Sequence, residues 1–352
     1  MSDQDLNLNN HLIQNFYIIG LDSSEIFDEK IYKDPTNLNI EPKVLTKFPN
    51  SSKTYNSIPN ELILKHCFPI GFKIINYPIQ PNNQNFFFTL ENIPLNFIDN
   101  KKYKNIHFNC YLFYEKLINY FKLKQNKFEY LNKEISNKIK TNEIENFYIP
   151  KIICLATLFP FPHEFAKILK IIHKNFTQEI NHIKNPIEKV IENLIMEIPL
   201  PSYGLYAFNY IFFKERFNFY KNPLNMLQNN SIELNVLFYL FKVEEIVKIF
   251  KGILLELPIV FFTPDKKKLT NSVESFLSII SPFDYCFPNV SILPCNCYSI
   301  IENYDSYVLG INEEFNENFF GENNLEIDDK NIIIIDLEKS NIIQTNNNNE
   351  NE

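Results

Sequence analysis

The chain has 352 residues, which is long for one compact domain and comfortable for two. Hydrophobic residues make up 45% of it and aromatic residues 15%, which excludes wholesale disorder. A net charge of −8 and a single arginine, Arg216, argue against the basic face that a nucleic-acid-binding protein needs to neutralise phosphates.

Residues 12–121 are expected to form a small α/β lobe. Residues 12–21 are an apolar run of strand length, whereas residues 22–60 are broken repeatedly by proline. The run NFFFTLEN at 85–92 has the aromatic density of a strand. Residues 107–121 begin with a strand pattern and then carry apolar side chains at helical spacing, so they are predicted to turn from strand to helix.

A linker and a second, larger lobe are expected after this point. Residues 122–146 are rich in Lys, Asn and Glu without a clean period, as linkers are. The second lobe is predicted over 147–340, and it opens with the buried strand IICLATL, which Pro160 stops. Helices are predicted at 163–176 and 186–198 from their apolar faces.

The clearest pattern of the second lobe is a helix at 243–257. Its apolar side chains are predicted to share one stripe, formed by Val243, Ile246, Val247, Phe250, Ile253, Leu254 and Leu257. A short buried strand is expected at 259–262. Thr263 as N-cap and Pro264 in the first turn are then expected to open a helix over 265–280.

The rest of the second lobe is predicted to alternate between strands and a short helix. The strands are expected at 290–293, 306–311 and 331–338, and the helix near 298–303. Short apolar strands alternating with helices indicate a largely parallel sheet that is covered on both faces. The Asn-rich tail, 341–352, is expected to be disordered.

Several classes of protein are excluded by what the chain lacks. It has six glycines, so no glycine-rich loop can cradle a phosphate, and neither self-standing nucleotide chemistry nor a cofactor is expected. No run of residues is long and apolar enough to span a membrane, and the N-terminus carries no secretory signal. The six cysteines show no framework spacing and are expected to be reduced thiols of a cytoplasmic protein.

No catalytic or metal-ligating group stands out either. Cys286, Cys295 and Cys297 lack the paired spacing of structural zinc, and no histidine is near them in the sequence. His163 and Glu164 do not form the HExxH motif of zinc proteases, because Lys167 occupies the position of the second ligand. We therefore expect no catalytic residue and no metal site.

The order of several segments carries a family resemblance. The segment PKIICLATLFPFPHEFAKIL (150–169) is followed by IEKVIENLIMEIPLPSYG (187–204) and by the long run VEEIVKIFKGILLELPIVFFTPDKKKLTNSVESFLSIISPF (243–283). In this order, with VSILP and YVLGI after them, they resemble the central part of the DENN family, whose tripartite modules act as exchange factors for Rab GTPases. The earlier segments NFYIIGLD (15–22) and HCFPIGFKI (66–74) are similar to the upstream, longin-like part of that family.

The resemblance implies an α/β fold of two lobes. The upstream, longin-like lobe is expected over 12–121, the linker over 122–146, and the larger central DENN lobe, with a mostly parallel sheet flanked by helices, over 147–340. The small downstream DENN part is expected to be missing, because the chain ends soon after the 331–338 strand.

The resemblance also implies a function. It points to an exchange factor, or an effector-like binder, for a Rab-type small GTPase in vesicle-mediated transport. Such a protein works in the cytoplasm, with peripheral contact to endomembranes, and it acts by binding the nucleotide-free GTPase in preference.

Two turns are the candidate GTPase interface. The proline-stiffened loop PLPSYGLY and the turn after Pro282 carry the candidate residues, which are Pro199, Pro201, Tyr203, Tyr206, Asp284, Tyr285 and Phe287. Exposed aromatic side chains anchor interfaces at a low cost in entropy. The tyrosines have an alternative role, which is to pack on their own lobe.

Three alternatives remain open at this stage. The chain is either an exchange factor or a non-catalytic DENN-like scaffold that binds partners without promoting exchange. A folliculin-like GTPase-activating subunit would need an arginine in the transition state, for which Arg216 is the only candidate. Residues 266–268, three lysines in a row, are either a contact for an acidic or anionic surface or a solvated helix start.

Overall fold

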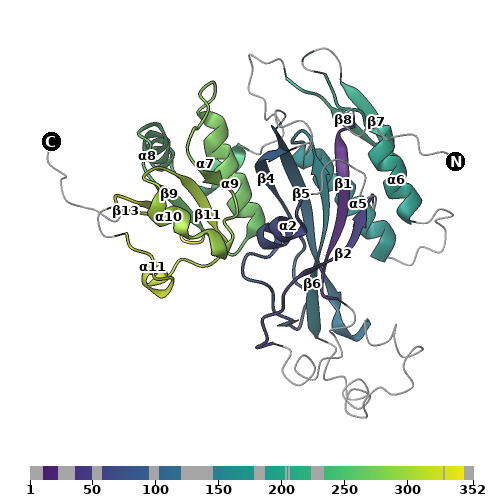
Figure 1. The fold of residues 1–352 in the computed structure, drawn as a ribbon, viewed down its shortest axis with the longest axis horizontal. Coiled ribbons are helices and arrows are strands. Elements are labelled where there is room, and N and C mark those ends of the chain that lie inside the picture. Colours follow the sequence, from purple (N-terminus) through teal and green to yellow (C-terminus); the bar gives the residue numbers. More distant parts are fainter. Residues whose placement is uncertain are drawn as a thin grey trace, which may run out of the picture.

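Two β-sheets lie on either side of the helix α9 (Lys266–Ile279) in the computed structural model of this protein (Figure 1). The structure describes residues 11–22, 36–49, 58–94, 103–119, 146–177, 187–202, 204, 207–222, 234–327 and 330–344. Among the helices of these residues, none combines the length and the apolar character needed to cross a bilayer. The linker expected at 122–146 falls almost entirely outside the described residues.

The first sheet is antiparallel throughout and contains six strands. Its order is β2-β1-β6-β5-β4, and β3 pairs with β6 beside this path. The strands are β1 (Ile13–Gly20), β2 (Lys43–Phe48), β3 (Ile75–Asn76), β4 (Gln84–Pro94), β5 (Tyr103–Lys116) and β6 (Phe147–Thr157). Five of its six strands lie within residues 12–121, which the sequence predicted to be a mixed α/β lobe, and the sixth is β6.

Both faces of the first sheet are buried, because alternate side chains of a strand point to opposite faces. Phe16 belongs to a core with helices α5 (Pro162–Thr177) and α6 (Ile187–Glu197) and with the hairpin of β7 (Phe208–Phe212) and β8 (Glu215–Phe219). Its neighbour Tyr17 belongs to a second core, which contains α2 (Asn60–Cys67) and α9.

The position of β6 differs from the expectation. The sequence placed this strand at the opening of the second lobe, next to a parallel sheet. In the structure it lies in the middle of the first sheet, between β1 and β5 and antiparallel to both. A strand that is buried on both faces has the same continuous apolar sequence in either setting, so its composition does not reveal its partners.

The second sheet has five strands in the order β10-β11-β9-β12-β13. Strands β10, β11, β9 and β12 run parallel to one another, and β13 is antiparallel to β12. The elements of this part are α7 (Asn235–Leu240), α8 (Val243–Leu254), β9 (Ile259–Phe262), β10 (Asn289–Val290), a 3₁₀ turn (Cys295–Cys297), α10 (Ser299–Asn303), β11 (Val308–Ile311), α11 (Phe319–Glu322), β12 (Ile333–Asp336) and β13 (Asn341–Gln344).

Helix α9 connects the two sheets through one continuous core. Alternate residues of β9 divide between two cores, with Ile259 and Phe261 facing α8 and α9, and Val260 and Phe262 facing α10 and α11. The first of these cores extends across α9 to the aromatic face of β4 and β5. The molecule is therefore mixed α/β, as predicted, and its two sheets share buried surface through α9.

Several local predictions need correction. Strand β5 continues to Lys116, so Leu112 and Phe113 belong to a strand and not to a helix. Helix α9 begins later than expected, because Asp265 is its N-cap and accepts a 3.0 Å hydrogen bond from the backbone N–H of Lys268.

The tail prediction is also wrong in part. Residues 341–344 form β13, where Ile342 and Ile343 pair with β12 and are half-buried. Residues 345–352 lie outside the described residues.

Candidate functional site

The first group of candidate interface residues does not form one described surface. Pro199 is exposed and forms an isolated β-bridge with His11. Pro201 is buried. Tyr203 and Tyr206 lie outside the described residues, so their role as interface anchors stays a prediction.

The second group lies together at the end of α9. Asp284, Tyr285 and Phe287 line one cavity of about 290 Å³. The C-terminal end of α8 and the residues after α9 complete its wall, with Ile253, Leu254, Glu256, Ile280, Phe283 and Cys286. The fold thus brings the turn after Pro282 against α8, which the sequence did not predict.

Tyr285 is held in place by two contacts. Its hydroxyl forms a 3.0 Å hydrogen bond with the Ser306 hydroxyl, and its ring meets the Phe287 ring edge to face at 5.8 Å. Burial raises the pKa of Tyr285, and the nearby Glu256 carboxylate raises it further. Asp284 is exposed and lines the same cavity as these rings. Tyr285 is therefore a positioned wall of the cavity and Asp284 a charged group at its rim.

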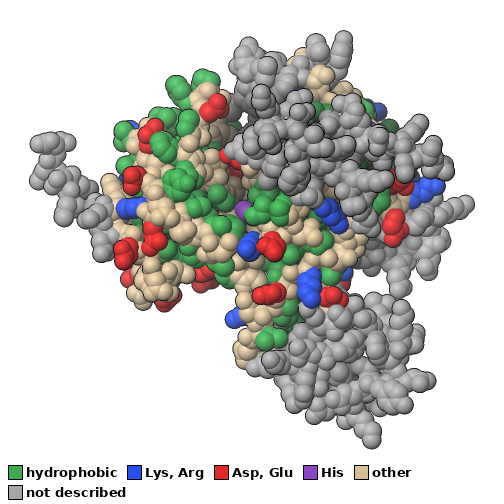
Figure 2. Space-filling view, in the orientation of Figure 1, with side chains coloured by type: hydrophobic (Ala, Val, Ile, Leu, Met, Phe, Trp, Pro, Cys, Tyr) green, Lys and Arg blue, Asp and Glu red, His purple; other side chains and the backbone are tan. Residues whose placement is uncertain are grey.

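The outer side of α8 is apolar and exposed. Val243 is 62% exposed, Leu255 70% and Phe283 70%, and Val247 and Leu254 are also exposed. We call these five residues the α8 surface. Figure 2 shows hydrophobic side chains gathered over the region where Figure 1 places α8 and α9. Soluble proteins rarely leave such a cluster exposed unless it binds something.

The α8 surface corrects the predicted apolar stripe. Seven residues were predicted to share one stripe, but the buried side of α8 consists of Ile249, Gly252 and Ile253, of which only Ile253 belongs to that stripe. Val243, Val247 and Leu254 are on the opposite side. The number of apolar residues was the available signal, since nine of the fifteen residues 243–257 are apolar and cover more of the helix than one core contact needs.

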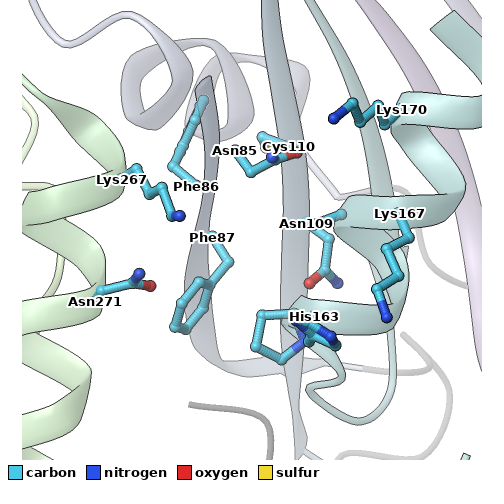
Figure 3. A pocket seen from close by; sticks show the side chains of 12 residues that line it. Asn85, Phe86, Phe87, Asn109, Cys110, His163, Lys167, Lys170, Lys267 and Asn271 are labelled. Atoms are coloured by element: carbon cyan, nitrogen blue, oxygen red, sulfur yellow. The ribbon is translucent and has the colours of Figure 1, made fainter. Parts of the chain in front are cut away.

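A second cavity, of about 200 Å³, lies where α9 meets the first sheet. We call it the junction cavity. It lies between β4 and β5, α5 and α9, and its lining residues are Asn85, Phe86, Phe87, Asn109, Cys110, Pro162, His163, Ala166, Lys167, Lys170, Lys267 and Asn271. Figure 3 shows basic and carboxamide side chains pointing toward it from both sides.

The lysine run at the start of α9 is not uniformly solvated. Lys266 is only 6% exposed, and its ammonium donates a 2.5 Å hydrogen bond to Asn312 Oδ1 and lies 5.7 Å from the centre of the Phe86 ring. Burial lowers the pKa of Lys266 to about 8. Lys268 forms a 2.8 Å ion pair with Glu338. The alternative of a solvated helix start is therefore wrong for Lys266.

Lys266 is expected to make stability depend on pH. Its pKa in the folded chain, about 8, lies below its value of 10.5 in the unfolded chain, so the folded chain binds fewer protons in this range. Stability should therefore rise as pH increases, by about 1–2 kcal/mol between about pH 8 and pH 9.5. Urea denaturation at a series of pH values measures this, and Lys266→Met should flatten the rise. The neighbouring Lys267→Met is the control and should keep it, and a rise that survives Lys266→Met would contradict the assignment.

The remaining candidates lie apart from these sites. Arg216 is exposed on β8, where it pairs with Ile211 in the hairpin that packs on α5, on the opposite side of the first sheet from α9 (Figure 1). Cys295 donates to the carbonyl oxygen of Pro69 at 3.0 Å. Across the described ranges, no group of three or more His, Cys, Asp or Glu side chains is arranged to hold a metal ion.

Comparison with known families agrees with the order of segments in the sequence. The family model for the DENN (AEX-3) domain matches residues 148–340. The match begins in β6, includes α5, α6, the α8 surface and strands β9 to β12 of the second sheet, and ends before β13. It covers more than half of the 352 residues. The chain therefore belongs to the DENN domain family.

Proposed function

We propose that this protein binds a Rab-type small GTPase and promotes nucleotide release by binding the nucleotide-free form more tightly. Membership of the DENN family implies small-GTPase partners and exchange-factor activity in general. An exchange factor does no covalent chemistry, because the difference between its affinities for the two GTPase states is what opens the nucleotide pocket. The corresponding structural feature is a binding surface and not a catalytic group.

The α8 surface is the observation that supports this proposal. Two of its residues, Leu254 and Phe283, line the same cavity as Asp284, Tyr285 and Phe287. An apolar patch with aromatic groups and a charged rim has the composition of protein interfaces. The switch regions of a GTPase offer a surface of matching character. We therefore place the GTPase on the α8 surface and on the turn after Pro282.

The domain assignment belongs to the same proposal. We assign the upstream, longin-like part to residues 12–121 and the central DENN part to 147–340, with β6 completing the sheet of the first part. The loop that carries Pro199, Tyr203 and Tyr206 is a second proposed contact, from which the buried Pro201 is left out. The setting that we propose is cytoplasmic, with peripheral contact to endomembranes during vesicle-mediated transport.

Capture experiments on a panel of Rab proteins test the exchange activity. The full chain should retain nucleotide-free Rab more strongly than GDP-loaded Rab, and it should accelerate the release of a fluorescent GDP analogue. Equal capture of both forms, without faster release, would favour a non-catalytic scaffold. Failure to capture any member of the panel in either form would contradict the proposal.

Charge introduced on the α8 surface is expected to weaken GTPase binding. Leu255→Asp and Phe283→Asp each place a carboxylate where we expect apolar contact, and each should weaken capture of nucleotide-free Rab by about tenfold or more. Ile79→Asp is the matched control, because Ile79 is 74% exposed but lies between β3 and β4. Titration of labelled Rab measures the affinities, and equal affinities for the three variants would move the interface elsewhere.

A further inference from the structure

The charged side chains that line the junction cavity are basic, whereas the chain as a whole carries a net negative charge. The chain as a whole carries 42 acidic and 34 basic residues. The cavity is lined by three lysines and a histidine, and no acidic residue is among the lining side chains. Glu164, in the first turn of α5, does not line the cavity, but its carboxylate interacts electrostatically with His163 and Lys167, so three lysines are offset by one acidic neighbour. This local excess of positive charge favours an anionic ligand.

The basic side chains reach the cavity from two separate helices. His163, Lys167 and Lys170 are spaced four and three residues apart, which places them on one face of α5. Lys267 comes from the first turn of α9, on the other side. Figure 3 shows Lys267 extending toward the centre from α9, with Lys167 on the opposite wall. Cations that converge from two walls can hold one anionic group between them.

The backbone reinforces the same charge. Pro162 and His163 begin α5 and Lys267 lies one residue inside α9, so the first turn of each helix contributes to the cavity wall. Helix N-termini carry partial positive charge and unpaired N–H groups. Lysines in the first turn of a helix oppose its dipole, and an anion bound beside them would offset that repulsion.

Carboxamides without partners also line the cavity. Asn271 is only 8% exposed, and within the described part of the chain its side chain makes no hydrogen bond. Asn85 presents a buried Oδ1 atom that has no hydrogen-bond partner among the described residues. By contrast, Asn109 donates to Thr157 Oγ1 at 3.2 Å. Buried polar groups are nearly always paired, so the unpaired Oδ1 atom of Asn85 beside this cavity indicates a missing ligand.

We propose that the junction cavity binds a phosphorylated polyol. The phosphate lies between Lys167 on α5 and Lys267 on α9, since ammonium groups bind phosphate strongly. A carboxamide both donates and accepts, so Asn271 and Asn85 suit the hydroxyl groups. The buried ring of Phe87 supplies an apolar wall for the ring carbon atoms. The cavity shares no lining residue with the α8 surface, so this inference does not rest on GTPase binding.

Calorimetric titration of the full chain tests the site. The probes are inorganic phosphate, pyrophosphate, inositol 1,4,5-trisphosphate and unphosphorylated inositol. We expect inositol trisphosphate to bind at least tenfold more tightly than pyrophosphate, and inositol alone not to bind. No binding of any phosphorylated probe would overturn the proposal. Tighter binding of pyrophosphate than of inositol trisphosphate would overturn the polyol assignment.

Lysine variants distinguish specific binding in the junction cavity from non-specific attraction of the anionic probe to surface lysines. The double variant Lys167→Gln with Lys267→Gln should weaken trisphosphate binding at least tenfold. Lys174→Gln is the matched control, because Lys174 is an exposed lysine of α5 that does not line the cavity. Asn271→Ala should reduce the preference for inositol trisphosphate over pyrophosphate. Unchanged binding in the double variant, with thermal unfolding showing that it is folded, would overturn the proposal.

A phosphorylated polyol can reach the cavity either as a free molecule in solution or as the head group of a lipid. Sedimentation with phosphatidylcholine vesicles, with and without a phosphoinositide, distinguishes the two. Co-sedimentation that needs both the phosphoinositide and the two lysines identifies a lipid source. Binding of the soluble probe without co-sedimentation identifies a free ligand. The variants Leu255→Asp and Phe283→Asp should leave phosphate binding intact, which keeps this test separate from that of GTPase binding.

Discussion

Replacing Gly310 by alanine should destabilise the protein by about 3 kcal/mol or more. A Cβ atom at this position would overlap the carbonyl oxygen of Ser291 and lie 3.0 Å from Cγ of Leu269. The first neighbour is backbone at the end of β10, and the second is a buried side chain of α9. Neither can move without separating β11 from the elements packed on it, so the cost comes from overpacking and not from backbone conformation.

Urea denaturation followed by circular dichroism measures this effect. Gly321→Ala is the control, because a Cβ at Gly321 meets nothing within 4 Å and the residue lies in α11. Alanine in a helix reduces the entropy of the unfolded chain, so this variant should be neutral or more stable by about 0.4–1 kcal/mol. Similar stabilities for the two variants would show that β11 does not approach Ser291 as described.

Replacing Phe276 by alanine should cost about 3–5 kcal/mol, because it leaves a cavity in the core that joins the two sheets. Phe276 is fully buried in α9, and its ring centre lies 5.7 Å from that of Phe261 and 5.9 Å from that of Phe241. The residue therefore contacts the second sheet and the region of α7 from one position. Loss of the ring removes packing from both.

The fall in the midpoint of chemical denaturation measures the cost of this change. Phe238→Ala is the matched control, since Phe238 is an aromatic residue of the neighbouring helix α7 and is 67% exposed. It should alter stability by no more than about 0.5 kcal/mol. If Phe276→Ala were as mild as this control, α9 would not be the shared core element that the structure shows.

Local periodicity was enough to predict many of the elements. The strands β1, β4 and β12 and the helices α5 and α8 were predicted from their apolar spacing and from proline stops, with small errors at their ends. These signals lie within a few residues of one another. The family was also recognisable, because the order of segments survives even where a single segment is an ordinary strand or helix.

Pairing and burial could not be predicted in the same way. The sequence of β6 shows that both its faces are apolar, but its partners are Ile13–Gly20 and Tyr103–Lys116, far away in the chain. The residues that became β13 looked like the start of a polar tail. Ile342 and Ile343 form a strand because they pair with β12, and the sequence of the tail alone does not reveal this pairing.

The candidate sites were likewise predicted only in part from the sequence. The sequence alone identified Asp284, Tyr285 and Phe287 as a candidate contact, and it predicted an apolar stripe on α8. Only the tertiary structure decided which side of α8 is exposed and that this turn lies against it. It also brought Asn85, Lys167 and Lys267 to one cavity. Spacing along the chain encodes which face of an element is apolar, whereas the choice of neighbour depends on packing between distant segments.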